Sequence, residues 1–172
     1  MKNVWGALLA TLLLALSLNV QAGKNDLSVS TKKLKITLSK EIRADEKKVD
    51  VIKRYEVMDR LKKELEGQLQ TYSGISRAEV EITSFRLRGG AAGYWGFSGK
   101  DVLDGQVVIK DKSKQLGRFG IQISRGGSGK TKPPTRRLVG LVQRFGEKFA
   151  MEAGAATGEM PAMKNFFRHK MR

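Results

Sequence analysis

Alternating apolar and polar residues predict four β-strands in this chain. In the first stretch, Leu34 to Leu38, apolar residues alternate with Lys35 and Thr37, as in a strand that buries only one of its faces. Three further stretches with the same period of two follow in order: Ala78 to Arg88, Asp101 to Lys112, and Leu116 to Ser124. The polar residues Asp111 to Gln115 predict a turn between the last two stretches, and therefore an antiparallel hairpin.

The second of these predicted strands changes phase along its length. Val80 and Ile82 occupy even positions, whereas Phe85 and Leu87 occupy odd ones. A side-chain period of two can move to the other parity only through a bulge, a bend or burial of both faces. We therefore predict a β-bulge near Ser84.

Two other stretches have apolar residues at steps of three and four, which predicts amphipathic helices. The first extends from Asp45 to Tyr72, so we expect one helix of about 25 residues, longer than the usual mean. Its apolar stripe should pack on the sheet, with a coiled-coil seam for a partner as the alternative. The second helix is expected to be capped by Thr135 and to end at Gly154.

The order strand, helix, three strands, helix predicts an α+β domain. We expect an antiparallel-rich twisted sheet of about four strands with both helices packed on one face. The length of 172 residues, with 40% hydrophobic and 29% charged residues, is typical of one globular domain. We place this domain at residues 23–154 and a basic C-terminal tail at residues 155–172.

The first 22 residues have the pattern of a secretory signal peptide. Lys2 precedes the apolar run Val4 to Leu18, and small residues flank the expected cleavage position at Ala22. We predict export and a periplasmic location after cleavage near Ala22. The apolar run is shorter than the roughly 20 residues of a membrane-spanning helix, so an uncleaved anchor is the alternative. The chain has no cysteine, so we expect neither disulfides nor a lipid-modified cysteine.

The chain is strongly basic, with 33 Lys and Arg residues against 17 Asp and Glu and a net charge of +16. Such a surplus favours partners that carry phosphate or carboxylate groups. Much of it lies in the last third of the chain, and Met163 to Arg172 has the pattern of a short basic amphipathic segment, which suggests peripheral membrane contact. A frayed or self-docked terminus is the alternative. The residues that we expect to bind an anionic surface are Lys130, Lys132, Arg136, Arg137, Lys164, Arg168, Lys170 and Arg172.

A glycine-rich stretch at residues 89–99 contains three large aromatic side chains, Tyr94, Trp95 and Phe97. Glycine permits unusual backbone conformations, and neighbouring rings provide adhesive apolar surface. We predict that this loop is an exposed contact site for a partner or an envelope surface. The alternative is a loop whose rings fold back on the core.

Residues for nucleophilic or metal catalysis are scarce. The chain has one histidine, His169, and no cysteine, which disfavours Ser-His-Asp and Cys-His arrangements as well as zinc sites. Strand ends and turns account for Asp101, Asp104 and Asp111. A hydrolase that uses a pair of carboxylates stays open, because Glu79, Glu81, Asp101 and Asp104 are present. We expect a protein that is not an enzyme and that has no cofactor and no metal.

The stretch Ser124 to Thr131 resembles a phosphate-binding loop without meeting its requirements. Ser124 stands where such a loop needs its first glycine, and Pro133 and Pro134 prevent a helix from starting directly after it. We therefore expect no nucleotide ligand.

Three parts of the sequence resemble a known family of exported bacterial proteins: Val80 to Arg88 with the glycine-rich aromatic loop, Lys100 to Asp111, and Leu116 to Ser124. The family is known as domain of unknown function forty-four ten, and the resemblance covers about residues 45–154. It implies a strand, helix, three-strand, helix domain in the Gram-negative envelope and supplies no catalytic residues. Many members are lipoproteins, whereas this chain lacks the acceptor cysteine.

Together these features predict a non-catalytic periplasmic binding or envelope-assembly protein that contacts an envelope protein or an anionic surface. The first alternative is a secreted protein that binds nucleic acid or another polyanion, with affinity that falls steeply with salt. The second alternative is the envelope hydrolase with a carboxylate pair.

Overall fold

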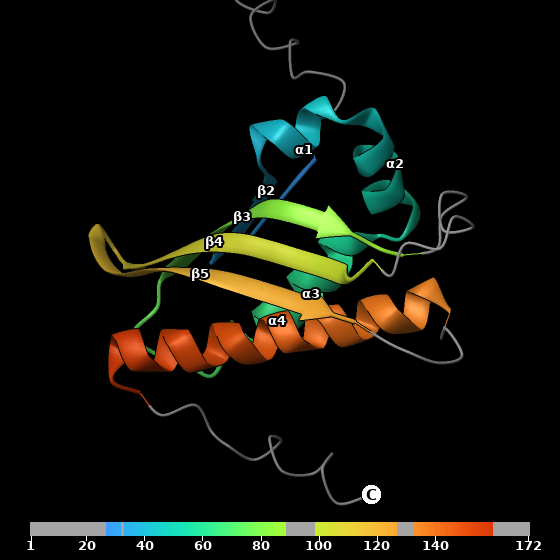
Figure 1. Cartoon of the computed structure of the whole chain (residues 1–172). Helices are drawn as coiled ribbons and strands as arrows, with labels where there is room; N and C mark the ends of the chain where they lie inside the picture. Colours follow the sequence, from blue (N-terminus) through green and yellow to red (C-terminus); the bar gives the residue numbers. More distant parts are fainter. Residues whose placement is uncertain (1–26, 32, 89–98, 127–132, 160–172) are drawn as a thin grey trace, which may run out of the picture.

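The computed structural model describes residues 27–31, 33–88, 99–126 and 133–159 (Figure 1). Within these ranges the chain forms an α+β fold around a five-stranded open sheet, which confirms the predicted fold class. The strand order follows the sequence order: β1 (Ser28–Ser30), β2 (Leu34–Leu38), β3 (Arg77–Arg86), β4 (Asp101–Asp111) and β5 (Lys114–Arg125). Strand β2 pairs with β3 in parallel, and the other pairs are antiparallel.

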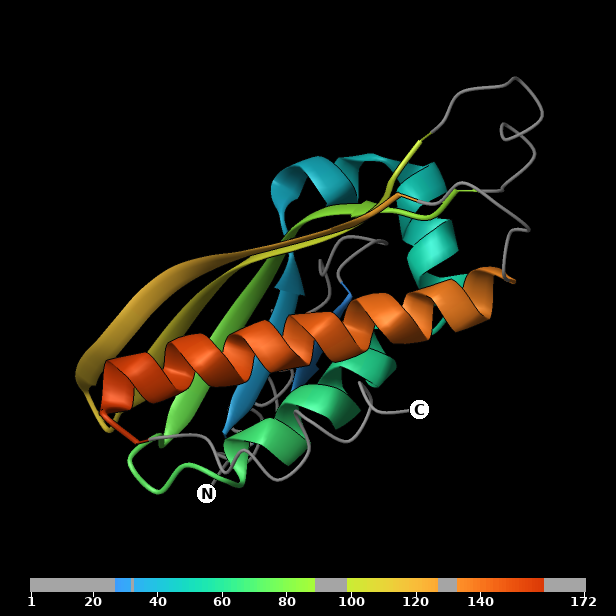
Figure 2. The same ribbon diagram turned by 60° about the horizontal axis from the view of Figure 1, so that its bottom comes forward.

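Helices α3 (Val57–Leu69) and α4 (Pro134–Thr157) pack on the same face of the sheet (Figure 2). Leu61 and Leu65 of α3 and Phe145 and Phe149 of α4 are completely buried against the inward-facing strand residues. The apolar stripes therefore pack on the sheet, as predicted. Burial of this kind is the main stabilising contribution to the fold.

The prediction of one long helix from Asp45 to Tyr72 is wrong. The structure has α2 (Glu46–Arg54) and α3, preceded by the short helix α1 (Lys40–Ala44). Glu56, between α2 and α3, takes a left-handed backbone conformation with φ of 51°. Arg60 Nε donates to the Tyr55 carbonyl at 3.1 Å, which satisfies an acceptor freed by the break.

This break lets both helices use the same core. Ile52 of α2 and Leu61 of α3 are both buried in the single hydrophobic cluster, although α2 lies beyond the end of the sheet and α3 lies on its face (Figure 1). Periodicity alone cannot reveal the break, because the apolar steps of three and four continue through it.

The bulge in β3 is confirmed. The register between β3 and β4 shifts between Ile82 and Ser84, so both Ile82 and Phe85 face the core. The predicted hairpin is also present, but its turn is shorter than expected. Asp111 pairs with Lys114, which leaves only Lys112 and Ser113 in the turn, and Lys112 has a φ of 52°.

The predicted boundaries of the last helix are wrong at both ends. Pro133 rather than Thr135 is the N-cap residue of α4, and the helix continues through Gly154 to Thr157. Gly154 is buried inside the helix, and Gly158, with a φ of 72°, is the residue that ends it. None of the helices in the described ranges is long and apolar enough to cross a membrane.

Candidate binding surface on the open face of the sheet

The sheet face opposite α3 and α4 carries polar and charged side chains in two rows that cross four strands. The strand register defines both rows. The first row contains Lys35, Glu79, Val108 and Arg118. The second row contains Thr37, Glu81, Gln106 and Gly120. We call these eight residues the open face.

A shallow groove of about 300 Å³ lies over the open face. Its lining consists of seven open-face residues, all except Gly120, together with Val80. It forms because the strand residues that point away from the helices have no covering layer among the described residues. A groove of this kind suits a ligand or partner that lies across the strands.

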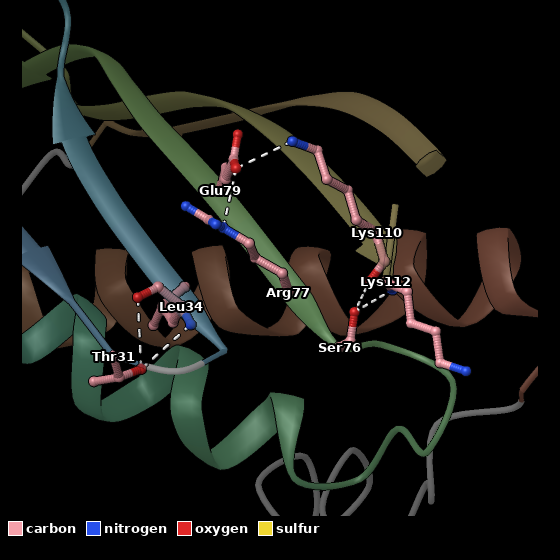
Figure 3. A network of polar contacts seen from close by, with 7 residues as sticks. All are labelled: Thr31, Leu34, Ser76, Arg77, Glu79, Lys110 and Lys112. Carbon is pink, nitrogen blue, oxygen red and sulfur yellow. Dashed lines mark hydrogen bonds and ion pairs between the residues drawn. The ribbon is translucent and has the colours of Figure 1, made fainter. Parts of the chain in front are cut away.

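Glu79 lies near the centre of the open face and is bonded to two cations (Figure 3). Lys110 Nζ donates to its Oε1 at 3.1 Å, and Arg77 Nε lies 3.1 Å from the same oxygen. The hydrogen bond from Lys110 holds the pKa of Glu79 below its usual value, and the charges of Arg77 and Lys35 act in the same direction. Glu79 is therefore a carboxylate at neutral pH, and neighbouring cations already balance its charge.

The polar contacts around Glu79 continue to the end of the hairpin. Ser76 Oγ donates to the Lys110 carbonyl at 3.1 Å and accepts from the Lys112 amide at 2.5 Å (Figure 3). These bonds fix the start of β3 against the end of β4. As a result, the cation of Lys110 stays beside Glu79.

The cations at the two ends of the first row do not form ion pairs with a carboxylate of the described residues, in contrast to Lys110 and Arg77. Lys35 and Arg118 are exposed, and neither forms a hydrogen bond or an ion pair with another described residue. Glu81 and Gln106 of the second row are also exposed. The arrangement provides a positive group at each end of the groove.

A second polar cluster is buried where β3 ends and β4 and α4 begin. Asp101 is completely buried, and its Oδ1 accepts from the Arg88 amide at 2.7 Å. Its carboxylate also forms ion pairs with Arg88, Oδ1 to Nε 3.7 Å, and with Arg137, Oδ2 to Nε 3.2 Å. Arg137 Nη2 donates in addition to the Arg88 carbonyl. We call these three residues the ion cluster.

The ion cluster changes the interpretation of Arg137. We expected this residue to bind an anionic surface, but only 6% of it is exposed and its guanidinium group faces Asp101. Arg137 is therefore a structural residue rather than part of an anion-binding surface. Its neighbour Arg136 is exposed on the first turn of α4, as that prediction requires.

The carboxylates of β4 do not converge on one place. Asp101 points toward the helices, whereas Asp104, three residues later, lies on the opposite face, where its Oδ1 accepts from the Ile123 amide at 3.2 Å. Burial raises the pKa of Asp104. Glu79 and Glu81 do share a face, but the pKa of Glu79 is lowered, which is unfavourable for a general acid. Among the described residues no group of three or more acidic or histidine side chains could hold a metal ion.

Most of the sites predicted from sequence lie outside the described residues. These are the aromatic residues Tyr94, Trp95 and Phe97 and the basic residues Lys130, Lys132, Lys164, Arg168, Lys170 and Arg172. Conversely, the sequence alone does not identify Lys35 and Arg118 as members of one site. Alternation places both on polar strand faces, but only the pairing of β2 with β3 shows that those faces are continuous.

No protein-family model matches this sequence, and no curated protein matches it. The resemblance to the exported bacterial family therefore stays a prediction.

Proposed function

We propose that this protein is a non-catalytic binding protein of the bacterial envelope and that it holds an anionic partner on the open face of its sheet. One observation carries the proposal. Glu79 is already balanced by Arg77 and Lys110, while Lys35 and Arg118 at the two ends of the same row have no bonding partner among the described residues. An anionic partner would place a negatively charged group directly beside each of these two cations, whereas Glu79 acts on Lys35 only through its charge and not through a hydrogen bond or an ion pair.

The charge of the whole chain supports the same proposal. A net charge of +16 attracts anions over distances of the order of 10 Å at moderate salt. Association with a negatively charged partner should therefore be fast and should weaken as salt is added. The location in the envelope rests on the signal-peptide pattern of residues 1–22.

A binding role is favoured over the carboxylate-pair hydrolase by the state of Glu79. A general acid needs a raised pKa, and the hydrogen bond from Lys110 lowers that of Glu79 instead. Asp101 is completely buried and forms ion pairs with two arginines.

Titration with fluorescently labelled polyglutamate tests the proposal. The double variant Lys35→Glu/Arg118→Glu should bind at least about tenfold more weakly than the native protein, because both ends of the groove then repel the probe. The control variant Lys53→Glu/Arg54→Glu changes the net charge equally at exposed positions of α2, away from the open face. Equal losses in the two variants would show that net charge alone attracts polyglutamate, and the proposal would then be wrong.

The nucleic-acid alternative keeps one supporting observation, the net charge of +16. A duplex oligonucleotide in the same titration separates the two functions. Binding of DNA that is tighter than binding of polyglutamate, and that the double variant at Lys35 and Arg118 leaves unchanged, would favour a general polyanion binder.

A further inference from the structure

We propose that the exposed edge of β5 pairs with an extended, acidic segment of a partner protein, which adds a strand to the sheet beside Arg118. This inference rests on the proposed function, because it specifies the anionic partner as a polypeptide. It also places the binding site at one border of the open face.

Strand β5 is a long edge strand. It is the last strand in the sheet order and has 12 residues, whereas β1, at the other edge, has only three. Helix α4 packs beneath its inner face, where the rings of Phe119 and Phe149 lie 6.3 Å apart. Gly120 is exposed, and since glycine has no side chain, this exposure belongs to the backbone of the strand. A long edge with accessible backbone is a template for an additional strand.

The hydrogen-bonding pattern identifies the backbone groups that are free for pairing. The Ala78 amide donates to the Lys33 carbonyl at 2.6 Å, toward the β2 side of β3. In a strand the N–H and C=O of one residue point to the same neighbouring strand, and this direction alternates from residue to residue. The backbone groups of Glu79 therefore point to β4.

The same alternation can be followed across the sheet. Glu79 pairs with Val108, so Val108 points back to β3 and Val107 points to β5. Val107 pairs with Phe119, so the backbone groups of Phe119 point to β4. The residues of β5 whose backbone groups point outward therefore include Arg118, Gly120, Gln122 and Ser124.

The charge of β5 defines the kind of strand that it can accept. Between Lys114 and Arg125 the strand contains three basic residues and no acidic one. Pairing with a second copy of β5 would bring two such strands together, and like charges on neighbouring strands are unfavourable. An acidic residue opposite Arg118 would instead extend the first row of the open face with a carboxylate. An acidic segment of another protein is therefore the occupant that fits.

The probe for this inference is a peptide of about the length of β5 in which glutamate alternates with threonine, so that its charged side chains share one face. A matched peptide carries N-methyl groups on alternate residues, which removes the amide donors of one edge and keeps the charge. We expect the N-methylated peptide to bind at least about tenfold more weakly, because it cannot form the ladder with β5. Equal binding of the two peptides would overturn strand addition.

Amide hydrogen exchange measured by NMR provides a second readout that needs no variant. On addition of the glutamate–threonine peptide, exchange of the outward-pointing Gly120 and Gln122 amides should slow at least about tenfold. The Phe119 amide, which already points to β4, should be unaffected and is the internal control. Unchanged exchange at Gly120 and Gln122 in the bound state would contradict the inference.

Charge reversal separates this inference from the proposed function. Arg118→Glu should weaken binding of the glutamate–threonine peptide and strengthen binding of a lysine–threonine peptide. Arg54→Glu should leave the binding of both peptides unchanged. If the N-methylated peptide binds as tightly as its parent but Arg118→Glu still weakens both, strand addition is wrong and anionic binding on the open face stands. If Arg118→Glu changes neither peptide, the proposed function fails as well.

Discussion

Asp101 and Arg137 form an ion pair with an Oδ2 to Nε distance of 3.2 Å, and both side chains are almost entirely buried. Asp101 begins β4, Arg137 belongs to the first turn of α4, and Arg88, which follows β3, provides a second cation. One carboxylate thus joins three elements that are far apart in the sequence. The cost of burying these charges is offset only while all three residues are present.

Replacement of Asp101 should destabilise the fold strongly. Asp101→Asn removes the carboxylate that pairs with the buried Arg137 and the partly buried Arg88, and we expect the free energy of unfolding to fall by about 3–5 kcal/mol. Urea denaturation followed by circular dichroism measures this change.

A matched control is available at an exposed ion pair. Glu56→Gln removes the carboxylate that lies 3.6 Å from Arg60 Nη2, where both side chains are largely exposed. We expect a loss below about 1 kcal/mol. Similar losses in the Asp101 and Glu56 variants would contradict the stabilising role of the ion cluster.

Gly105→Ala and Gly67→Ala should have opposite effects on stability. A Cβ atom at Gly105 would lie 3.0 Å from the Glu81 carbonyl and 3.1 Å from the Phe145 ring, so we expect a loss of about 1–3 kcal/mol from overpacking. A Cβ at Gly67, inside α3, meets nothing within 4 Å, and the higher helix propensity of alanine should add up to about 1 kcal/mol. Thermal unfolding of both variants checks the two signs.

Tyr72→Phe should remove a buried hydrogen bond between the end of α3 and α4. The Tyr72 hydroxyl donates to the Ala150 carbonyl at 2.5 Å, and its loss should cost about 1 kcal/mol. Burial raises the pKa of Tyr72, so the stability contributed by the neutral hydroxyl is complete below the ordinary value near 10 and is lost as the pH rises above it. The native protein should therefore lose more stability than Tyr72→Phe between about pH 9 and 11. Parallel losses in the two proteins would contradict this assignment.

Glu79→Gln should strengthen binding of polyglutamate. The substitution releases Lys110 and Arg77 from their shared carboxylate and leaves the backbone unchanged, so affinity should rise by about threefold. Fluorescence anisotropy measures the change. Weaker binding would instead indicate that the Glu79 carboxylate itself contacts the partner, contrary to the proposed function.

The sequence predicts the parts of this fold that depend on local periodicity. The strand at Leu34–Leu38, the bulge near Ser84 and the hairpin all follow from the alternation of side chains. The left-handed conformation of Glu56 does not, because the apolar steps of three and four continue across the helix break. It is set by tertiary packing, which requires α2 and α3 to reach one core from different directions.

The candidate binding surface was harder to predict for the same reason. Lys35 and Arg118 belong to one row only because β2 pairs in parallel with β3. These two strands are separated in the sequence by α1, α2 and α3. The prediction that Arg137 binds an anionic surface was wrong because its counter-ion, Asp101, lies far from it along the chain. Charge counts locate basic segments, but they do not show which cations already have a partner in the fold.

The most direct test of the central claim is an NMR titration of the isotope-labelled protein with unlabelled polyglutamate. We expect the largest shifts at open-face residues, in particular Lys35, Gln106 and Arg118, and no shift at Arg54 on α2. Shifts at α2 or within residues 160–172, with an unchanged open face, would contradict the proposal that this surface binds the anionic partner.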